Sequence, residues 1–146
     1  MFPGKEVDED DVRRWVRAAL GDGGLPRPWG IGVNCSRVEN LSPVVSIMHN
    51  EVQRLIDQDQ FVDEWRAFRQ RPWLVLYPEG TQGGEYDPAT KSWIQMEDAS
   101  MRPWDEVYLE MARQLKPADW EGVVIGGCCR TKPEHIAALR WKLENS

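Results

Sequence analysis

Three short apolar runs, set between amphipathic segments, constrain the fold more than any other feature of the sequence. The runs are WGIGVNC (residues 29–35), WLVLY (73–77) and GVVIGG (122–127). Each is short and almost free of charge, as expected of a strand that is buried on both faces of a parallel sheet. Because helical patterns lie between the runs, the order predicts strand–helix units joined by right-handed crossovers, and hence an α/β fold.

Amphipathic periodicity predicts helices around and between these strands. In residues 9–20, Val12, Val16 and Ala19 recur at the spacing of one helical face. Ser42 is the expected cap of a second helix, with Pro43 in its first turn. Further helices are predicted at residues 61–70, 103–115 and 131–143, the last with a capping box between Thr131 and Glu134. Residues 78–102 show no clear period and are expected to form a long loop.

Cysteine side chains stand at the ends of the first and third predicted strands. Cys35 closes the first run, and the adjacent pair Cys128 and Cys129 follows the third. The carboxyl ends of parallel strands meet at one edge of a sheet, which is where the sites of such folds lie. We therefore expect the three sulfurs to converge there. Gly126 and Gly127 would let the chain turn sharply enough for both sulfurs of the pair to face one point.

The number and spacing of these cysteines favour a particular kind of metal site. Structural zinc sites have four ligands, commonly with paired C-x₂-C motifs, whereas catalytic zinc keeps three protein ligands and an open fourth position. Three thiolates make an electron-rich zinc centre, which suits holding a substrate thiol in its nucleophilic form better than activating water. The matching reaction is methyl transfer to that thiol. A cationic sulfonium donor can rest against aromatic rings, and the chain has eight tryptophans.

Other interpretations of the same residues remain open at this point. Cys35 can be an ordinary core residue, because cysteine is among the most buried residue types. The adjacent pair can also be core, or can form a vicinal Cys128–Cys129 disulfide in a redox protein, although disulfides are rare in the cytosol. His49 is expected to be a packing or surface residue. His135, in the first turn of the last helix, is expected to have a structural role.

Length and charge exclude several classes of function. A chain of 146 residues predicts a single domain, residues 1–146. The formal net charge of −6 argues against a nucleic-acid partner, which would require clustered Lys and Arg. No apolar stretch reaches the roughly 18 residues of a membrane span, so no membrane contact is expected. The first ten residues are polar and acidic, unlike a secretory signal, and a cytoplasmic location is therefore expected.

Four segments together resemble one known family. They are VIGGCCRTKPEHI at residues 124–136, GVNC at 32–35, LVLYP at 74–78 with the glycines, Glu85-Tyr86 and Trp93 that follow, and FPG at 2–4. In order and spacing they are similar to the C-terminal part of the homocysteine S-methyltransferase family, which binds homocysteine in a barrel domain. The resemblance spans nearly the whole chain.

The resemblance implies a fold, a cofactor and a reaction. The fold would be a partial (β/α)₈ TIM barrel, made of its last three strand–helix units with parallel strands. Cys35, Cys128 and Cys129 match the family's Zn²⁺ ligands. Asn34, Gly126 and Gly127 would shape the substrate site. The implied partners are homocysteine and a methyl donor such as S-methylmethionine or S-adenosylmethionine, and the implied product is methionine.

The chain also departs from the family pattern. A complete barrel needs about 250 residues, and Glu79 stands where the family often has Asn. The first five strands would be missing, and three strands cannot close a barrel. The alternative function is therefore a truncated or degenerate zinc-binding homologue that needs a partner chain or has no turnover. The expected assembly is a homo-oligomer or a complex with the missing barrel half.

Overall fold

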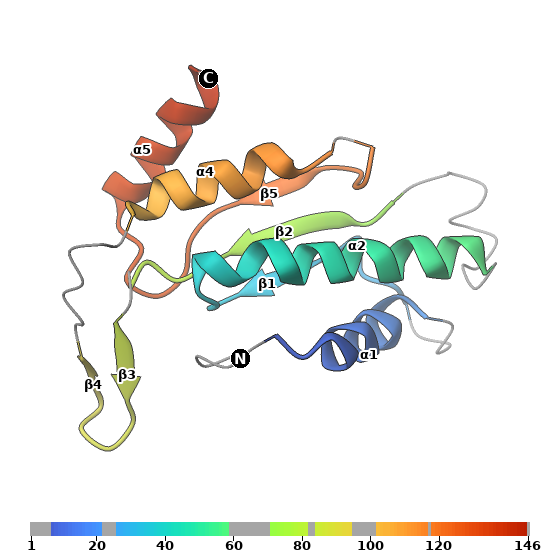
Figure 1. Cartoon of the computed structure of the whole chain (residues 1–146), viewed down its shortest axis with the longest axis horizontal. Helices are drawn as coiled ribbons and strands as arrows, with labels where there is room; N and C mark the ends of the chain where they lie inside the picture. Colours follow the sequence, from blue (N-terminus) through green and yellow to red (C-terminus); the bar gives the residue numbers. More distant parts are fainter. Residues whose placement is uncertain are drawn as a thin grey trace.

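The computed structural model describes six stretches of the chain, residues 7–21, 26–58, 71–81, 84–94, 102–116 and 118–145. Two features expected from the sequence lie outside them, namely the helix at residues 61–70 and the segment at residues 2–4. The structure is α/β, as predicted, with helices packed on a small parallel sheet (Figure 1).

The three apolar runs form that parallel sheet. Strands β1 (Gly30–Asn34), β2 (Trp73–Tyr77) and β5 (Val123–Ile125) pair in the order β1-β2-β5, so that β2 is central. The register aligns Asn34 with Tyr77 and Leu76 with Ile125. All three carboxyl ends therefore lie at the same edge of the sheet, as the sequence predicted.

Helices account for most of the remaining described chain. They are α1 (Glu9–Leu20), α2 (Leu41–Asp57), α4 (Trp104–Gln114) and α5 (Pro133–Glu144), with a 3₁₀ turn, η1 (Val38–Asn40), before α2. Their apolar stripes join the strands in one core, whose buried members include Val16, Met48, Leu74, Leu76 and Tyr108. Asp8 caps α1 by accepting hydrogen bonds from the Asp10 and Asp11 amides.

The two faces of the sheet carry different side chains. Successive residues of a strand point to opposite faces. One face belongs to the core, and its side chains in β1 and β2 are at most 6% exposed, namely Ile31, Val33, Leu74 and Leu76. The opposite face carries glycines and the half-exposed rings of Trp73 and Tyr77. A Cβ on Gly32 would lie 1.8 Å from the Val75 carbonyl oxygen, so only glycine allows this close pairing of strands.

The expected loop at residues 78–102 is in part an antiparallel hairpin. Its strands are β3 (Glu85–Asp87) and β4 (Ser92–Ile94). Asp87 orders the turn, because its carboxylate accepts hydrogen bonds from the Ala89 amide and the Thr90 hydroxyl, both at 2.8 Å. These bonds also lower the pKa of Asp87, the side-chain bond from Thr90 being the larger cause. Strands of three residues are too short to produce a recognisable period, which explains why the pattern missed them.

Both predicted helix caps are wrong. Helix α2 begins at Leu41, because η1 runs directly into it, and the Ser42 hydroxyl instead donates to Gln114 at 3.2 Å. At α5 the N-cap is Lys132, whose amide donates to Nδ1 of His135 at 3.1 Å. The predicted box between Thr131 and Glu134 does not form, because the N-cap is one residue later than predicted, and the Thr131 side chain lies against Gly127.

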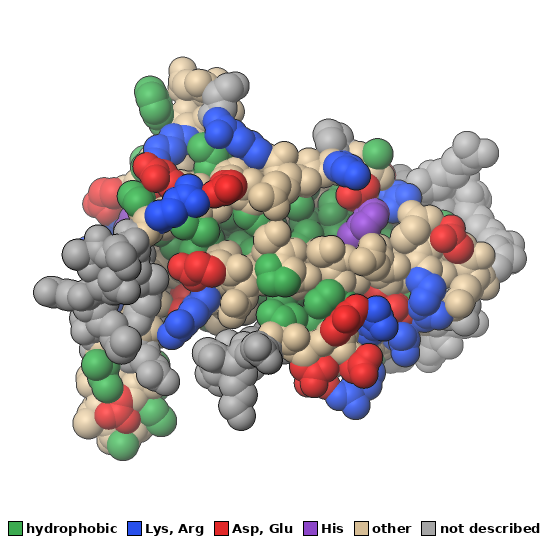
Figure 2. Space-filling view, viewed as in Figure 1, with side chains coloured by type: hydrophobic (Ala, Val, Ile, Leu, Met, Phe, Trp, Pro, Cys, Tyr) green, Lys and Arg blue, Asp and Glu red, His purple; other side chains and the backbone are tan. Residues whose placement is uncertain are grey.

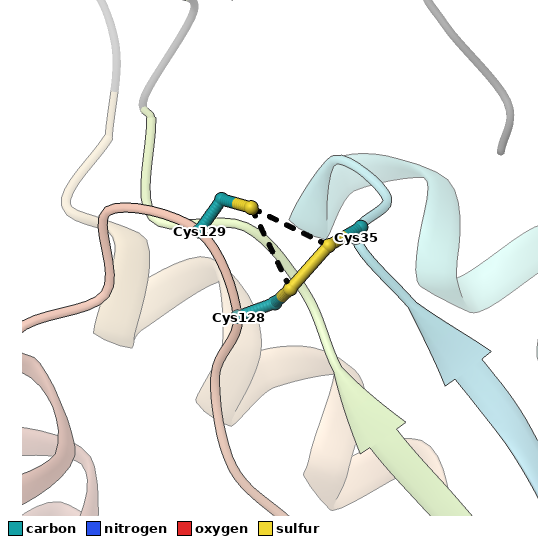
Figure 3. A group of neighbouring side chains, drawn as sticks. All are labelled: Cys35, Cys128 and Cys129. Carbon is teal, nitrogen blue, oxygen red and sulfur yellow. Dashed lines mark hydrogen bonds between the residues drawn. A yellow bond between two sulfur atoms is a disulfide. The ribbon is translucent and has the colours of Figure 1, made fainter.

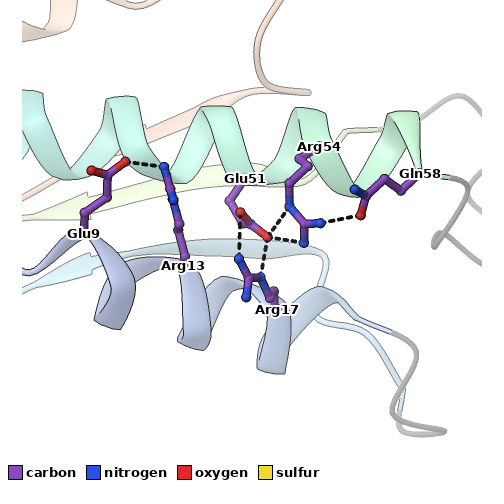
Figure 4. Close-up of polar contacts among 6 residues, drawn as sticks. All are labelled: Glu9, Arg13, Arg17, Glu51, Arg54 and Gln58. Atoms are coloured by element: carbon purple, nitrogen blue, oxygen red, sulfur yellow. Dashed lines mark hydrogen bonds and ion pairs between the residues drawn. The ribbon is translucent and has the colours of Figure 1, made fainter.

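A buried carboxylate joins α1 to α2 (Figure 4). Glu51 is 2% exposed and accepts hydrogen bonds from Arg17 Nε at 2.6 Å and from Arg54 Nε at 2.9 Å. Burial acts to raise the pKa of Glu51, but the bonds from Arg54 and Arg17 outweigh it, and the net pKa is lowered. Glu51 therefore remains charged and holds the two helices together.

The outer surface of these helices is strongly polar. Figure 2 shows acidic and basic side chains interspersed over α1 and α2. Within the described residues, none of the helices combines the length and the apolar character that crossing a bilayer demands.

Candidate metal centre

The three cysteine sulfurs converge at the carboxyl edge of the sheet (Figure 3). Cys35 Sγ lies 3.5 Å from Cys129 Sγ, and Cys128 Sγ lies 3.7 Å from Cys129 Sγ. Cys35 and Cys128 are joined as a disulfide, while Cys129 is free and exposed. All three sulfurs lie within 4.8 Å of one another. The predicted convergence is confirmed, whereas the alternative of a vicinal Cys128–Cys129 disulfide does not match the pairing observed.

Two residues of the cysteine turns have unusual backbone conformations. Cys35 has a φ of 51° and Arg130 a φ of 58°, both in the left-handed region that non-glycine residues rarely adopt. Cys35 directly follows β1, and Arg130 directly follows the cysteine pair. Strained residues of this kind persist only where the surrounding structure enforces them, and they cluster at functional sites.

One segment that holds both cysteine turns in place is the chain that continues from β2, here called the β2 extension. It comprises residues 77–80 and so includes the last residue of β2. It passes between the two cysteine-bearing turns (Figure 3). On one side, the Cys35 amide donates to the Tyr77 carbonyl at 2.9 Å. The Glu79 amide donates to the Ser36 carbonyl, also at 2.9 Å. The turn after β1 is therefore held at two points.

The opposite side of the β2 extension holds the cysteine pair in the same way. The Cys128 amide donates to the Pro78 carbonyl at 2.9 Å, and the Gly80 amide donates to the Cys129 carbonyl at 2.8 Å. A Cβ on Gly80 would lie 2.9 Å from the backbone of Arg130 and Thr131. Four main-chain hydrogen bonds thus fix both cysteine turns to one central segment. The sequence pattern did not predict this role, and Gly80 was the one residue of the segment that could have indicated it.

The three residues predicted to shape the substrate site lie beside the cysteines. Asn34 is exposed and directly precedes Cys35. A Cβ on Gly126 would lie 2.3 Å from the ring of Tyr77, and one on Gly127 would lie 2.3 Å from Thr131 Cγ2. A side chain at either glycine would force the neighbouring side chain to shift. A role in substrate binding stays a prediction for all three.

The two histidines have packing roles, as expected. His135 accepts the Lys132 amide and lies 5.7 Å from the ring of Trp104, centroid to centroid. His49 lies between Asp119, whose carboxylate is 3.6 Å away, and Trp120. In the described part of the chain, the only group of three or more potential metal ligands is the cysteine cluster.

The spacing of the sulfurs fits a tetrahedral metal ion. A Zn–S distance of about 2.3 Å places tetrahedral ligands roughly 3.8 Å apart. The two distances to Cys129, 3.5 and 3.7 Å, are close to that value. The third pair is the disulfide, so the full ligand set forms once Cys35 and Cys128 are reduced. Soft thiolates of this kind suit zinc, Cu(I) or iron–sulfur clusters, not the hard ions Mg²⁺ and Ca²⁺.

Comparison with known proteins identifies relatives of one kind. The family model described as homocysteine S-methyltransferase matches residues 3–143. The homocysteine S-methyltransferase YbgG of Bacillus subtilis is 29% identical over 114 residues, covering 75% of this chain and 26% of that protein. Homocysteine S-methyltransferase 3 of Arabidopsis thaliana is 29% identical over 137 residues, covering 92% of this chain and 36% of its own length.

A third relative, the homocysteine S-methyltransferase of Escherichia coli, is also 29% identical, over 118 residues that cover 80% of this chain and 29% of that protein. The chain thus spans about a third or less of the length of these curated relatives. No solved structure matches it significantly. Since the family model extends over nearly all of its residues, the chain belongs to the homocysteine S-methyltransferase family.

Proposed function

We propose that this chain takes part in zinc-dependent transfer of a methyl group from a sulfonium donor, S-methylmethionine or S-adenosylmethionine, to the thiol of homocysteine, forming methionine. The observation that carries the proposal is the convergence of three cysteine sulfurs within 4.8 Å. Family membership supports the reaction class, because the relatives are all homocysteine S-methyltransferases.

The roles of the chain's residues follow from the geometry. Cys35, Cys128 and Cys129 would hold Zn²⁺, leaving the fourth position on the exposed side, where Cys129 lies. Zinc bound there would supply an acceptor site for the homocysteine sulfur and lower the pKa of its thiol. Asn34 directly precedes Cys35, and Gly126 and Gly127 directly precede the cysteine pair, so all three would border the substrate thiol.

The proposed reaction moves one methyl group from a sulfonium sulfur to the homocysteine sulfur. The homocysteine thiol loses its proton to solvent, and its sulfur lone pair attacks the donor methyl carbon in line. A new S–CH₃ bond forms while the sulfonium S–CH₃ bond breaks, and the bonding pair goes to the departing sulfur, which becomes a neutral thioether. No general base on the chain is required once the thiol is ionised.

We further propose that β1, β2 and β5 correspond to the last three strands of a (β/α)₈ barrel, in one domain. The relatives are about three to four times as long as the region matched, so donor binding would involve barrel strands that these three do not supply. The alternative function is a zinc-binding homologue without turnover. The parallel sheet with the cysteines at its carboxyl edge is compatible with both functions, methyl transfer and zinc binding without turnover.

Metal content tests the site directly. The purified chain, reduced and then supplied with Zn²⁺, is expected to hold one zinc per chain. Cys128→Ser should lose it, whereas Arg140→Gln, an exposed change on α5, should keep it. Absence of zinc from all three proteins, with the fold intact by circular dichroism, would refute the proposed site.

Turnover separates the two functions. Methionine formation from homocysteine is measured with S-methylmethionine and, separately, with S-adenosylmethionine. Product formed by the chain, and abolished in Cys128→Ser, supports methyl transfer and identifies the donor. Stoichiometric zinc without any methionine favours the non-catalytic alternative.

A further inference from the structure

Trp104 contacts the β2 extension at its centre. This residue begins α4 and is only 1% exposed. Its indole Nε1 donates a hydrogen bond of 2.8 Å to the carbonyl of Glu79. The amide of Glu79 meanwhile binds the turn that carries Cys35. A buried side chain on a helix is thus bonded to the segment that lies between the cysteine turns.

The ring of Trp104 also packs against the start of α5, the helix that follows the second cysteine turn. It lies 5.7 Å from the imidazole of His135, with the two planes inclined by 34°. His135 accepts the Lys132 amide, three residues after Cys129, and so fixes the start of α5. One aromatic side chain therefore contacts the β2 extension through its N–H and, through its ring, the first turn of α5, which follows the Cys128–Cys129 turn.

We propose that Trp104 is a positioning residue, which holds the Cys35 turn and the Cys128–Cys129 turn at the separation that metal binding requires. The inference rests on the proposed function, since it assigns a supporting residue to the same site. Residues outside the ligand set orient metal ligands, and their loss typically weakens metal affinity by about 10- to 100-fold. Here the support passes through main-chain groups of residues 77–80.

Tyr108 provides a matched control on the same helix. It is fully buried, packs edge-to-face against Trp104 at 5.0 Å, and donates its own hydrogen bond to a β2 carbonyl, that of Leu76, at 2.7 Å. That carbonyl lies within the strand, where the Gly126 amide also bonds to it at 2.9 Å. Tyr108→Phe therefore removes a similar bond from the strand but none from the β2 extension.

Hydrogen exchange in the reduced, metal-free chain tests the positioning role without depending on metal. Trp104→Phe should speed exchange of the Gly80 and Cys128 amides by about tenfold or more relative to the amides of β2, because local opening of the extension becomes easier. Tyr108→Phe should leave that ratio unchanged. Equal ratios in the two variants would overturn the inference, whatever the chain's affinity for zinc.

Competition with a chelator gives the second readout. Trp104→Phe is expected to weaken Zn²⁺ binding by about tenfold or more, with a changed thiolate-to-metal absorption when Co²⁺ replaces Zn²⁺. Tyr108→Phe should bind both ions as wild type does. If Trp104→Phe does not fold, Trp104→Tyr takes its place. Wild-type affinity in the Trp104 variant refutes the inference and leaves the proposed function standing, whereas a wild type that binds no zinc refutes the proposed function itself.

Discussion

The two faces of the three-stranded sheet differ in what their side chains contribute. On the helix-covered face, the inward residues of β1 and β2 are branched and almost fully buried. On the opposite face, the glycines of β1 lie beside residues of β2 that are half-buried or exposed, including Trp73 and Tyr77. The comparison indicates that one face provides the folding free energy. The other, which carries glycines and partly exposed rings, buries much less apolar surface.

The largest expected effect is on the covered face. Leu74 is fully buried, and Leu74→Ala should reduce the free energy of unfolding by about 2–5 kcal/mol, through lost transfer energy and the cavity left behind. Urea denaturation measures it. A matched pair sharpens the comparison, because Val33→Ala, on the covered face, should cost clearly more than Val75→Ala on the opposite face. Equal costs would show that both faces are packed in solution.

Glycine substitutions probe the opposite face. Gly32→Ala would place a Cβ 1.8 Å from a backbone oxygen, so the strands must separate, and a cost of about 3 kcal/mol or more is expected. Gly126→Ala meets only the ring of Tyr77, which can rotate away, and should cost about 1 kcal/mol. Thermal unfolding compares the two variants. A Gly32→Ala protein as stable as wild type would contradict the observed register.

The Glu51 ion pairs give a pH-dependent effect outside the sheet. The folded pKa of Glu51 is lowered, so its contribution to stability is complete above the unfolded pKa, about 4.5, and is lost as pH falls through the folded value. Glu51→Gln should cost about 2 kcal/mol at pH 7 and less at pH 3. The measurement is urea denaturation at both pH values. A cost that does not depend on pH would mean that Glu51 is not charged in the folded chain.

The smallest expected effects on stability come from two tyrosines, Tyr108 in α4 and Tyr77 in β2. Tyr108 is buried, and burial raises the pKa of its hydroxyl, which stays protonated and donates to Leu76. Tyr108→Phe should cost about 1 kcal/mol. Tyr77 is 36% exposed, and Tyr77→Phe should change stability by less than about 0.5 kcal/mol. Reversal of this order in chemical denaturation would contradict the assignment of the faces.

The main elements were predictable because they follow from periodicity. The apolar runs became β1, β2 and β5, and the helix expected at residues 9–20 is α1 at the same bounds. The convergence of Cys35 with Cys128 and Cys129 also followed, since parallel strands end at a common edge. These predictions needed only the spacing of residue types and the rule of strand direction.

The details that failed depend on local competition between partners. Ser42 is a good capping residue in isolation, but Gln114 takes its hydroxyl. Thr131 has the correct spacing to Glu134, but its side chain packs on Gly127. Apart from Gly80, nothing in the sequence indicated the role of the β2 extension, because its four bonds run between main-chain atoms, which every non-proline residue possesses.

Those main-chain bonds have a consequence for how the family can diverge. Main-chain carbonyl and amide groups hold the cysteine turns. The side chains of residues 78 and 79 can therefore be replaced without moving the sulfurs. The Glu79 carboxylate, for example, accepts a hydrogen bond from the Thr81 hydroxyl at 2.8 Å and bonds to neither cysteine turn. Gly80 is the exception, since a methyl group there would collide with the turn behind the cysteine pair. The amino acids along this strip can thus change while the three sulfurs keep their positions.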